Sequence, residues 1–368
     1  MAELGMGIAA AGLAIKALAD SDKGMANIYL GTANFISVIV CIFLAAIIFF
    51  VVVVLYKYNV INWDAAGVIM IISAANLVAV VMGVGEAAFR ATDRYAAGTV
   101  FSTSARLFEW IGFIFGLLLF NDFLKIALMI LLFRVMAFAA QVFYIKKYID
   151  VGWCFGWGGV NVVKIITKPA LQLSAFPVAG LLSIQGVTIA VGSFYGSSAV
   201  GIFNACRTYS RVVLQAVNII SNPLLNWMAI NISNKNISEV KFVCRRAFML
   251  FSAVGVVLPV LLYVFHASVF YAWTGGGIVI EDMLMAAFLV NSFFVAMYSF
   301  PRSILIAANK PGELVGIIVF SAFAQVVCAS FGGAYLDMTE MVILLGFFDA
   351  LILIKSLHAS KIAINNLA

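Results

Sequence analysis

Residues 198–222 read SAVGIFNACRTYSRVVLQAVNIISN, an apolar run in which polar side chains recur every three or four positions. The recurring residues are Asn204, Arg207, Arg211, Gln215, Asn218 and Asn222. On a helix they fall within an arc of about 80° and extend about 27 Å, close to the thickness of a membrane's hydrocarbon core. Because such a stripe is costly against lipid, we expect it to face other helices or water.

The composition of the whole chain indicates that lipid surrounds most of it. Of 368 residues, 65% are hydrophobic and 10% are charged, and the mean hydropathy is +1.12. Soluble domains are about 45–50% apolar and about 25% charged. These values exclude a soluble enzyme, a secreted disulfide scaffold and a nucleic-acid-binding module. The sequence contains no phosphate-binding loop and no nucleophile elbow, so we expect no enzyme activity, no catalytic residues and no cofactor.

The apolar segments predict an all-α, polytopic membrane protein with about 11 transmembrane helices. They lie near 3–19, 31–56, 65–86, 98–120, 124–145, 170–192, 198–222, 247–271, 283–300, 313–332 and 341–357. The one long polar interval divides them into five helices and six. The predicted domains are an N-terminal bundle over 1–147, a cytoplasmic interfacial linker over 148–169 and a C-terminal bundle over 170–368.

The basic residues predict the orientation in the membrane. Fifteen of them, Arg302 included, fall in one set of alternate loops, whereas the opposite loops hold only Lys57 and Lys125. Basic loops stay in the cytoplasm, so the C-terminus is predicted to be cytoplasmic. Eleven helices then leave the N-terminus outside, although the first segment is short and carries Glu3 and Lys16. One more helix before it would make this start easier to understand.

A faint internal repeat links the two predicted bundles. The stretch Ala91-Thr-Asp-Arg94 aligns with Ala307-Ala-Asn-Lys310 at an offset of 216 residues, and Phe115-Gly116 aligns with Phe331-Gly332. Internal repeats are common in transporters.

Charged residues inside the predicted spans indicate a wet, cationic cavity. The basic ones are Lys16, Arg106, Arg134, Arg207 and Arg211. Each costs roughly 2.5–3.5 kcal/mol in the bilayer centre, and few buried acids are available to pair with them. Three other interpretations stay open: interhelical hydrogen bonds for the amides, a local pair between Arg106 and Glu109, and a snorkelling Lys16.

Two carboxylates and two histidines complete the set of candidate groups. Asp349 is a possible ion site or a packing partner for an arginine, and Glu109 is a second candidate for ion coupling. His266 and His358 lie far apart in the sequence, without carboxylates close to them in sequence, so we expect no metal site.

Several stretches resemble one transporter family. They are Gln185-Gly186, Gly192, Tyr195-Gly196, the block Arg207-Thr-Tyr-Ser-Arg211, Asn222-Pro223, the opening Ala2-Glu-Leu-Gly-Met-Gly7, Trp273-Thr-Gly275 and Ala307-Ala-Asn-Lys310. Together they resemble the polysaccharide flippases, which include the O-antigen flippases, of the multidrug/oligosaccharidyl-lipid/polysaccharide exporter (MOP) superfamily. The resemblance extends from end to end, but the helix that opens the family's fold is missing.

The resemblance implies a 12-helix fold of two bundles around a central cavity that works by alternating access. Its members flip an undecaprenyl-diphosphate-linked oligosaccharide across the bacterial inner membrane, for O-antigen or related polysaccharides. By position, Arg207 and Arg211 are the diphosphate partners, supported by Arg106 and Arg134. The polar lining would be Asn204, Gln215, Asn218 and Asn291. Expected partners are this substrate, membrane lipid and other membrane proteins of polysaccharide assembly.

Two alternatives remain. A drug/cation antiporter of the same superfamily would need buried carboxylates, which the excess of buried bases disfavours. A truncated, non-transporting membrane remnant would account for the missing first helix.

Overall fold

The computed structural model describes residues 5–151, 155–277 and 280–365, and these residues form helices and no strand. Residues 2–4 of the opening motif lie outside the described residues. The chain divides into two compact units, Met1–Ser174 and Ala175–Ala368. The all-α prediction is therefore confirmed. Among the described residues, nine helices are long and apolar enough to cross a membrane.

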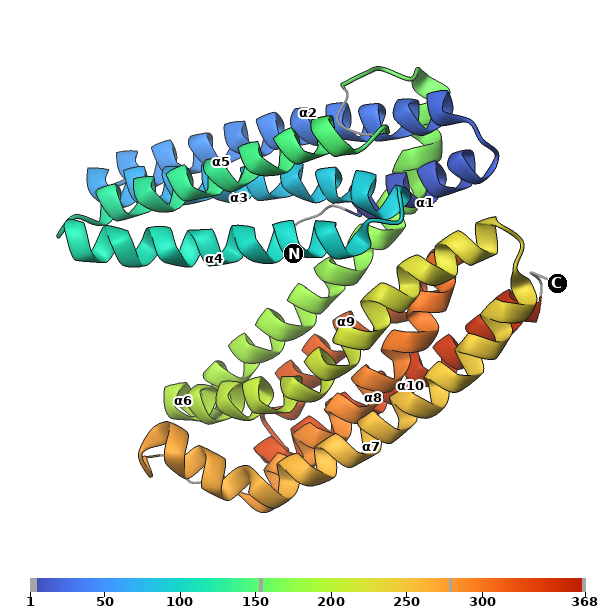
Figure 1. Cartoon of the computed structure of the whole chain (residues 1–368). Helices are drawn as coiled ribbons and strands as arrows, with labels where there is room; N and C mark the ends of the chain where they lie inside the picture. The colour runs from blue at the N-terminus through green and yellow to red at the C-terminus, as the bar shows by residue number, and fades with distance from the viewer. Residues whose placement is uncertain (1–4, 152–154, 278–279, 366–368) are drawn as a thin grey trace. The chain divides into compact units, whose positions relative to one another are not determined.

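Five helices belong to the N-terminal unit, and four follow in the C-terminal unit after a long helix that passes from one unit into the other (Figure 1). The first five are α1 Met6–Ala19, α2 Lys23–Lys57, α3 Trp63–Ala91, α4 Tyr95–Leu119 and α5 Phe123–Tyr148. The remainder are α6 Val160–Ser233, α7 Ile237–Thr274, α8 Asp282–Ala307, α9 Gly312–Gly332 and α10 Met338–Asn365. At 14 residues, α1 is the short apolar helix among them.

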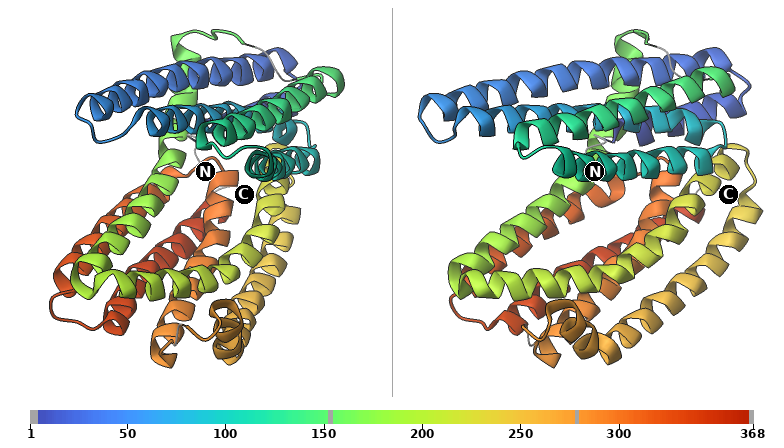
Figure 2. Two further views of the ribbon diagram at one scale, coloured as in Figure 1. Left: turned by 90° about the vertical axis from the view of Figure 1, so that its left-hand side faces the viewer. Right: turned by 60° about the vertical axis from the view of Figure 1, so that its left-hand side comes forward.

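Helix α6 is broken at Gly196, where φ is 86° and ψ is 174°. Glycine adopts a positive φ without a steric penalty, so the chain can reverse direction there. Figure 2 shows the two arms of α6 that result. The apolar segments 170–192 and 198–222 lie on these two arms.

Helix α6 begins at Val160, inside the interval 148–169 that the sequence assigned to a linker. Val162, Ile166 and Ala170 are buried at a spacing of four residues, whereas Lys164 and Lys168 are exposed. This is the pattern of an amphipathic helix, so the lysines of residues 160–169 lie on one face of α6.

Small residues set the packing of the N-terminal unit. Helix α4 contacts α5 along Gly112 and Gly116, where a side chain would meet the Met129 carbonyl or the Ile126 backbone. Helix α3 packs on α5 and on α2, and α1 packs on α2 and α3. Residues spaced like these glycines let membrane helices approach closely.

The C-terminal unit is organised around α8, which has the largest buried share of the candidate spans. Helix α8 packs on α10 and α7, and α10 packs on α9. Its buried face joins apolar residues from α6, α7 and α10 in two clusters, which include Phe203 with Phe288 and Phe251 with Phe300.

The turns of the two units repeat at the offset that the sequence suggested. Asp93 follows α3 and Asn309 follows α8, each with φ 56°. In both turns the next amide bonds back to the helix, Arg94 to the Phe89 carbonyl at 2.9 Å and Lys310 to the Leu305 carbonyl at 2.8 Å. This is a Schellman-type end, in which the residue after the helix is left-handed.

The preceding turns repeat in the same way. Asn59 has φ 55° after α2, and Gly275, 216 positions later, has φ 64° after α7. The following amides bond to the carbonyls of Leu55 at 3.0 Å and Tyr271 at 3.2 Å. The two units are therefore built on one repeated pattern of helices and turns.

Substituting Gly346 tests the packing of α8 on α10. A Cβ at Gly346 would overlap the side-chain amide of Asn291, which packs directly on this glycine. Overpacking of this kind costs about 1–3 kcal/mol. We expect Gly346→Ala to lower the free energy of unfolding by that amount, measured by denaturant unfolding of the purified protein in detergent. Gly316→Ala on α9, where a Cβ has open space, is the matched control and should change stability little.

Candidate functional site

The C-terminal unit contains a half-open cavity of about 320 Å³. Both arms of α6 line it, together with α8, α9 and α10. Its polar lining consists of Ser183, Arg207, Ser210, Arg211, Asn291, Ser292, Tyr298, Arg302, Gln325 and Asp349. The other lining residues are apolar or aromatic. Three guanidinium groups thus share the cavity with one carboxylate.

The protein itself holds Arg207 in place. Its Nη1 donates to the Ile184 carbonyl at 3.1 Å and to Thr188 Oγ1 at 2.9 Å, and lies 3.4 Å from Asn204 Oδ1. The guanidinium carbon lies 4.4 Å from the centre of the Phe203 ring, a cation–π contact. Arg207 therefore braces one arm of α6 against the other, with part of its guanidinium left to face the cavity.

Arg211 and Arg302 differ from Arg207 in this respect. Both are half-buried, and neither forms a hydrogen bond or an ion pair with any residue in the described part of the chain. The guanidinium carbon of Arg302 lies 5.8 Å from the centre of the Tyr298 ring. Half-buried guanidinium groups without an anionic partner are suited to binding an anion that enters the cavity.

Asp349 belongs to a small hydrogen-bonded group on the cavity wall. Gln325 Nε2 donates to Asp349 Oδ1 at 3.3 Å and to the Leu345 carbonyl at 3.2 Å. Ser183 Oγ donates in turn to Gln325 Oε1. The group links α6, α9 and α10, and Asp349 forms no ion pair with an arginine of the described residues.

Asn291 has an interhelical role. Its Nδ2 donates to the Val342 carbonyl on α10 at 2.8 Å, and its side chain borders the cavity. Asn291 thus forms an interhelical hydrogen bond, a common role for amide side chains in membrane proteins.

The rest of the stripe on α6 leads away from this cavity. Asn204 contacts Arg207, but Gln215 is exposed and Asn218 is half-buried, and neither is among the lining residues. The stripe therefore contributes Arg207 and Arg211 to the cavity and continues beyond it.

The predicted charged residues of the N-terminal unit form an ion pair between two helices. Arg134 Nη1 on α5 lies 3.1 Å from Glu109 Oε1 on α4, and the two side chains are 11% and 26% exposed. Arg106 is exposed and makes no ion pair with Glu109. The local Arg106–Glu109 pair is thus wrong: the close packing of α4 on α5 brings Arg134 to the carboxylate instead. Lys16 is exposed on α1.

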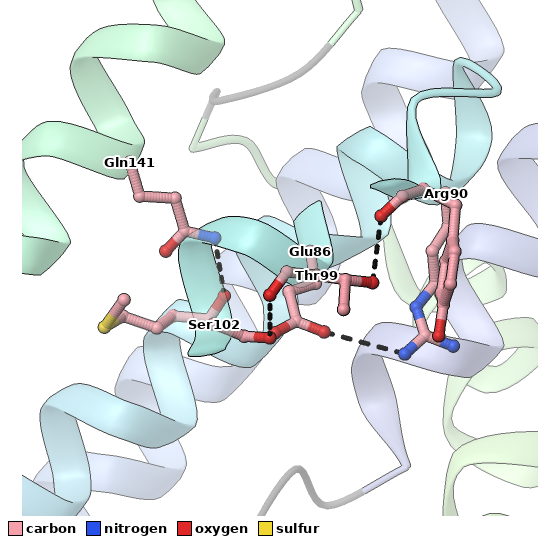
Figure 3. A network of polar contacts seen from close by, with 7 residues as sticks. Glu86, Arg90, Thr99, Ser102 and Gln141 are labelled. Carbon is pink, nitrogen blue, oxygen red and sulfur yellow. Dashed lines mark hydrogen bonds and ion pairs between the residues drawn. The ribbon is translucent and has the colours of Figure 1, made fainter. Parts of the chain in front are cut away.

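A second polar network lies in the same unit (Figure 3). Glu86 and Arg90 on α3 form an ion pair at 3.6 Å, and both are largely buried. Gln141 Nε2 on α5 donates to the Met82 carbonyl at 3.2 Å, and Ser102 Oγ donates to the Thr99 carbonyl at 3.2 Å. This network pairs its charges internally, in contrast to the arginines of the C-terminal cavity.

The polar pairs of the two units stand at equivalent places. Gln325 follows Glu109 by 216 positions, and Asp349 follows Arg134 by 215 positions. Each pair joins the last two helices of its unit, α4 with α5 and α9 with α10. The repeat thus extends from the turns to the polar contacts.

Sequence reasoning missed Arg302, Gln325, Tyr298 and Ser183. The apolar segment ends at 300, before Pro301, so the sequence places Arg302 in a cytoplasmic loop. In the structure α8 continues to Ala307, since a proline is tolerated in a membrane helix. Gln325 could have been found from the repeat, because it corresponds to Glu109.

The two histidines do not belong to a metal site among the described residues. Within 5–151, 155–277 and 280–365, no group of three or more His, Cys, Asp or Glu side chains could hold a metal ion. His266 does have a carboxylate partner: its Nε2 lies 3.1 Å from Asp282 Oδ1. Asp282 is 16 residues away in sequence and begins the next helix, so the sequence alone does not reveal it as the partner.

Comparison with known proteins identifies the fold. No model of a known protein family matches the sequence, and no curated protein matches it. Among solved structures, a MOP superfamily transporter from Pyrococcus furiosus is similar with a TM-score of 0.83 and 12% identity, over 99% of this chain and 84% of that one. The Vibrio cholerae MATE transporter VcmN has a TM-score of 0.84 and 14% identity, over 99% and 85%.

A multidrug resistance MATE family transporter in its outward-facing conformation is similar to the same degree. The TM-score is 0.83 and the identity 12%, over 99% of this chain and 84% of that chain. The chain is therefore a multi-pass helical membrane protein with the fold of the MATE transporters of the MOP superfamily. At these identities the likeness shows the fold.

Proposed function

We propose that the protein is a transporter that flips an undecaprenyl-diphosphate-linked oligosaccharide, an O-antigen or related repeat unit, across the bacterial inner membrane by alternating access. The observation that carries this proposal is the excess of arginine in the cavity. The cavity lining contains three arginines, Arg207, Arg211 and Arg302, and a single carboxylate, Asp349. Guanidinium groups bind phosphate oxygens in a planar, bidentate manner, so this lining favours an anionic cargo.

The size of the cavity supports a role in binding the polar head of such a cargo. Ligand cavities measure about 300–1,000 Å³, and this one, at about 320 Å³, lies at the small end. It suits a diphosphate with its first sugar rather than a whole oligosaccharide. Arg106 and Arg134 in the N-terminal unit, with Asn204, Gln215 and Asn218, remain proposed parts of a larger path. The cytoplasmic C-terminus belongs to the same proposal.

A drug/cation antiporter is the second candidate. It is favoured by Asp349, a carboxylate on the cavity wall, and by the fold shared with a multidrug resistance transporter. A cationic drug would pair with Asp349 but would meet three guanidinium groups in the same space. Because of this repulsion, the cavity favours an anionic cargo over a cationic one.

Transport in proteoliposomes tests the proposal. The purified chain is reconstituted with a fluorescent undecaprenyl-diphosphate-linked oligosaccharide, and in a parallel set with a cationic dye. Flipping of the lipid-linked sugar, absent in protein-free vesicles, is the expected result. Movement of the dye alone would replace the proposal by the antiporter, and movement of neither would indicate a non-transporting remnant.

We assign ion coupling to Asp349 rather than to Glu109, because Arg134 already neutralises Glu109. One pH unit across the membrane is worth about 1.4 kcal/mol per proton, so a coupled proton supports about tenfold accumulation. We expect Asp349→Asn to remove gradient-driven accumulation while exchange without a gradient continues. The measurement compares both assays with those of Glu313→Gln, an exposed carboxylate on α9 that should behave like the wild type. Unchanged accumulation in Asp349→Asn would contradict the assignment.

A further inference from the structure

His266 joins two helices at one end of the C-terminal unit. It lies on α7, two turns before that helix ends at Thr274, and its imidazole is buried. Asp282 is the first residue of α8, and its side chain is 75% exposed. The pair therefore connects the end of one helix to the beginning of the next, and neither residue lines the arginine cavity.

Both nitrogens of the imidazole face oxygen atoms. Nδ1 lies 2.6 Å from the Tyr263 carbonyl oxygen, and Nε2 lies 3.1 Å from Asp282 Oδ1. A carbonyl and an ionised carboxylate can only accept hydrogen bonds, and a neutral imidazole has one N–H to donate. The neutral ring would leave a nitrogen lone pair facing an oxygen. Both hydrogen bonds can form only when His266 and Asp282 together hold one proton more than a neutral imidazole and an ionised carboxylate.

The surroundings favour a proton that is held but still exchanges with water. The His266 side chain is 9% exposed, and its ring stacks on the Tyr263 ring with the ring centres 5.4 Å apart. The titratable groups in contact with it among the described residues are Tyr263, on its own helix, and Asp282, on α8. Glu281 precedes Asp282, and the Tyr209 hydroxyl on α6 donates to the Leu262 carbonyl one turn earlier on α7. The N-terminus of α8 also stabilises the ionised Asp282 carboxylate. The Asp282 side chain is 75% exposed, so the proton can exchange with water through it.

We propose that His266 and Asp282 form a proton-binding site, open to the aqueous phase at this end of the unit, and that the bound proton fastens α7 to α8. When the proton leaves, the Nε2–Asp282 hydrogen bond is lost and the ends of the two helices separate more easily. The site is distinct from the proposed transport cavity and does not depend on which cargo the protein carries.

Nitrogen NMR of the full-length protein in detergent tests the site directly, because the chain has only two histidines. With ¹⁵N-labelled histidine, the exposed His358 is removed by His358→Gln, which leaves His266 as the sole ring signal. In the folded protein at about pH 6.5, both nitrogens of His266 should carry hydrogen, as their contacts with the Tyr263 carbonyl and Asp282 require. A neutral ring at this pH would overturn the proposal, and this measurement needs no change to the pair itself.

A variant of the carboxylate adds a second readout. In Asp282→Asn the amide can donate to Nε2, so the ring should be neutral in the same buffer. The melting temperature of the wild type and of His358→Gln should fall by roughly 2–4 °C as the pH rises from about 6 to about 8, whereas that of Asp282→Asn should stay level. An equal fall in Asp282→Asn would overturn the fastening role. A failure of the proteoliposome assay would leave both measurements unaffected.

Discussion

Glu109→Ala should destabilise the N-terminal unit by about 3–5 kcal/mol, because it leaves the Arg134 guanidinium buried without its partner. The two side chains are mostly buried, so little water is available to replace the lost contact. The measurement is denaturant unfolding of the purified protein in detergent. The double variant Glu109→Gln with Arg134→Gln should lose clearly less, because it leaves no unpaired charge.

The matched control for this prediction is Arg106→Gln, one turn away on the same helix. Arg106 is exposed and makes no ion pair within the described residues. Its substitution breaks no ion pair and should therefore lower the free energy of unfolding by no more than about 0.5 kcal/mol. If Arg106→Gln were as damaging as Glu109→Ala, the assignment of Glu109 to Arg134 would be wrong.

The double variant Arg211→Gln with Arg302→Gln should lower flipping of the lipid-linked oligosaccharide by a hundredfold or more, by about 3–6 kcal/mol of lost binding. Each arginine would make charge-assisted hydrogen bonds worth about 1.5–3 kcal/mol, so each single variant should lose roughly tenfold or more. The initial flipping rate in proteoliposomes, at limiting substrate, is the measurement. Neither residue has a hydrogen bond or ion pair with a described residue, so folding should be little affected.

Two further variants separate binding from folding in this assay. Arg245→Gln removes an exposed positive charge on α7, outside the cavity, and should leave flipping unchanged. Arg207→Gln should lower the thermal stability, because Arg207 holds the two arms of α6 together. Equal losses of flipping in Arg245→Gln and in the double variant would show a general effect of net charge and contradict an anion site.

The sequence predicts the features that depend on periodicity within one helix, namely the helix itself and the face on which a residue lies. The spacing of Arg207 and Arg211 places both on one face of α6, and the structure brings both to the cavity. The apolar runs likewise predict helices, because each run is long enough to cross a membrane and lacks the alternation of a strand.

Contacts between helices could not be predicted in this way. The partner of Glu109 is 25 residues away, on α5, and its identity depends on the register set by Gly112 and Gly116. Periodicity also gives a face of a helix without saying which of its residues border a cavity. Leu214 lines the cavity of the C-terminal unit, whereas Gln215 and Asn218 are not among its lining residues and remain proposed parts of a larger path.

The polar pairs that join the last two helices of each unit affect which movements of the protein are costly. Glu109–Arg134 lies wholly within the N-terminal unit, and Gln325–Asp349 lies wholly within the C-terminal unit. Separating a buried ion pair costs several kcal/mol, a barrier that slows any movement that requires it. A movement of either unit as a whole, which the proposed alternating access calls for, would therefore break neither contact.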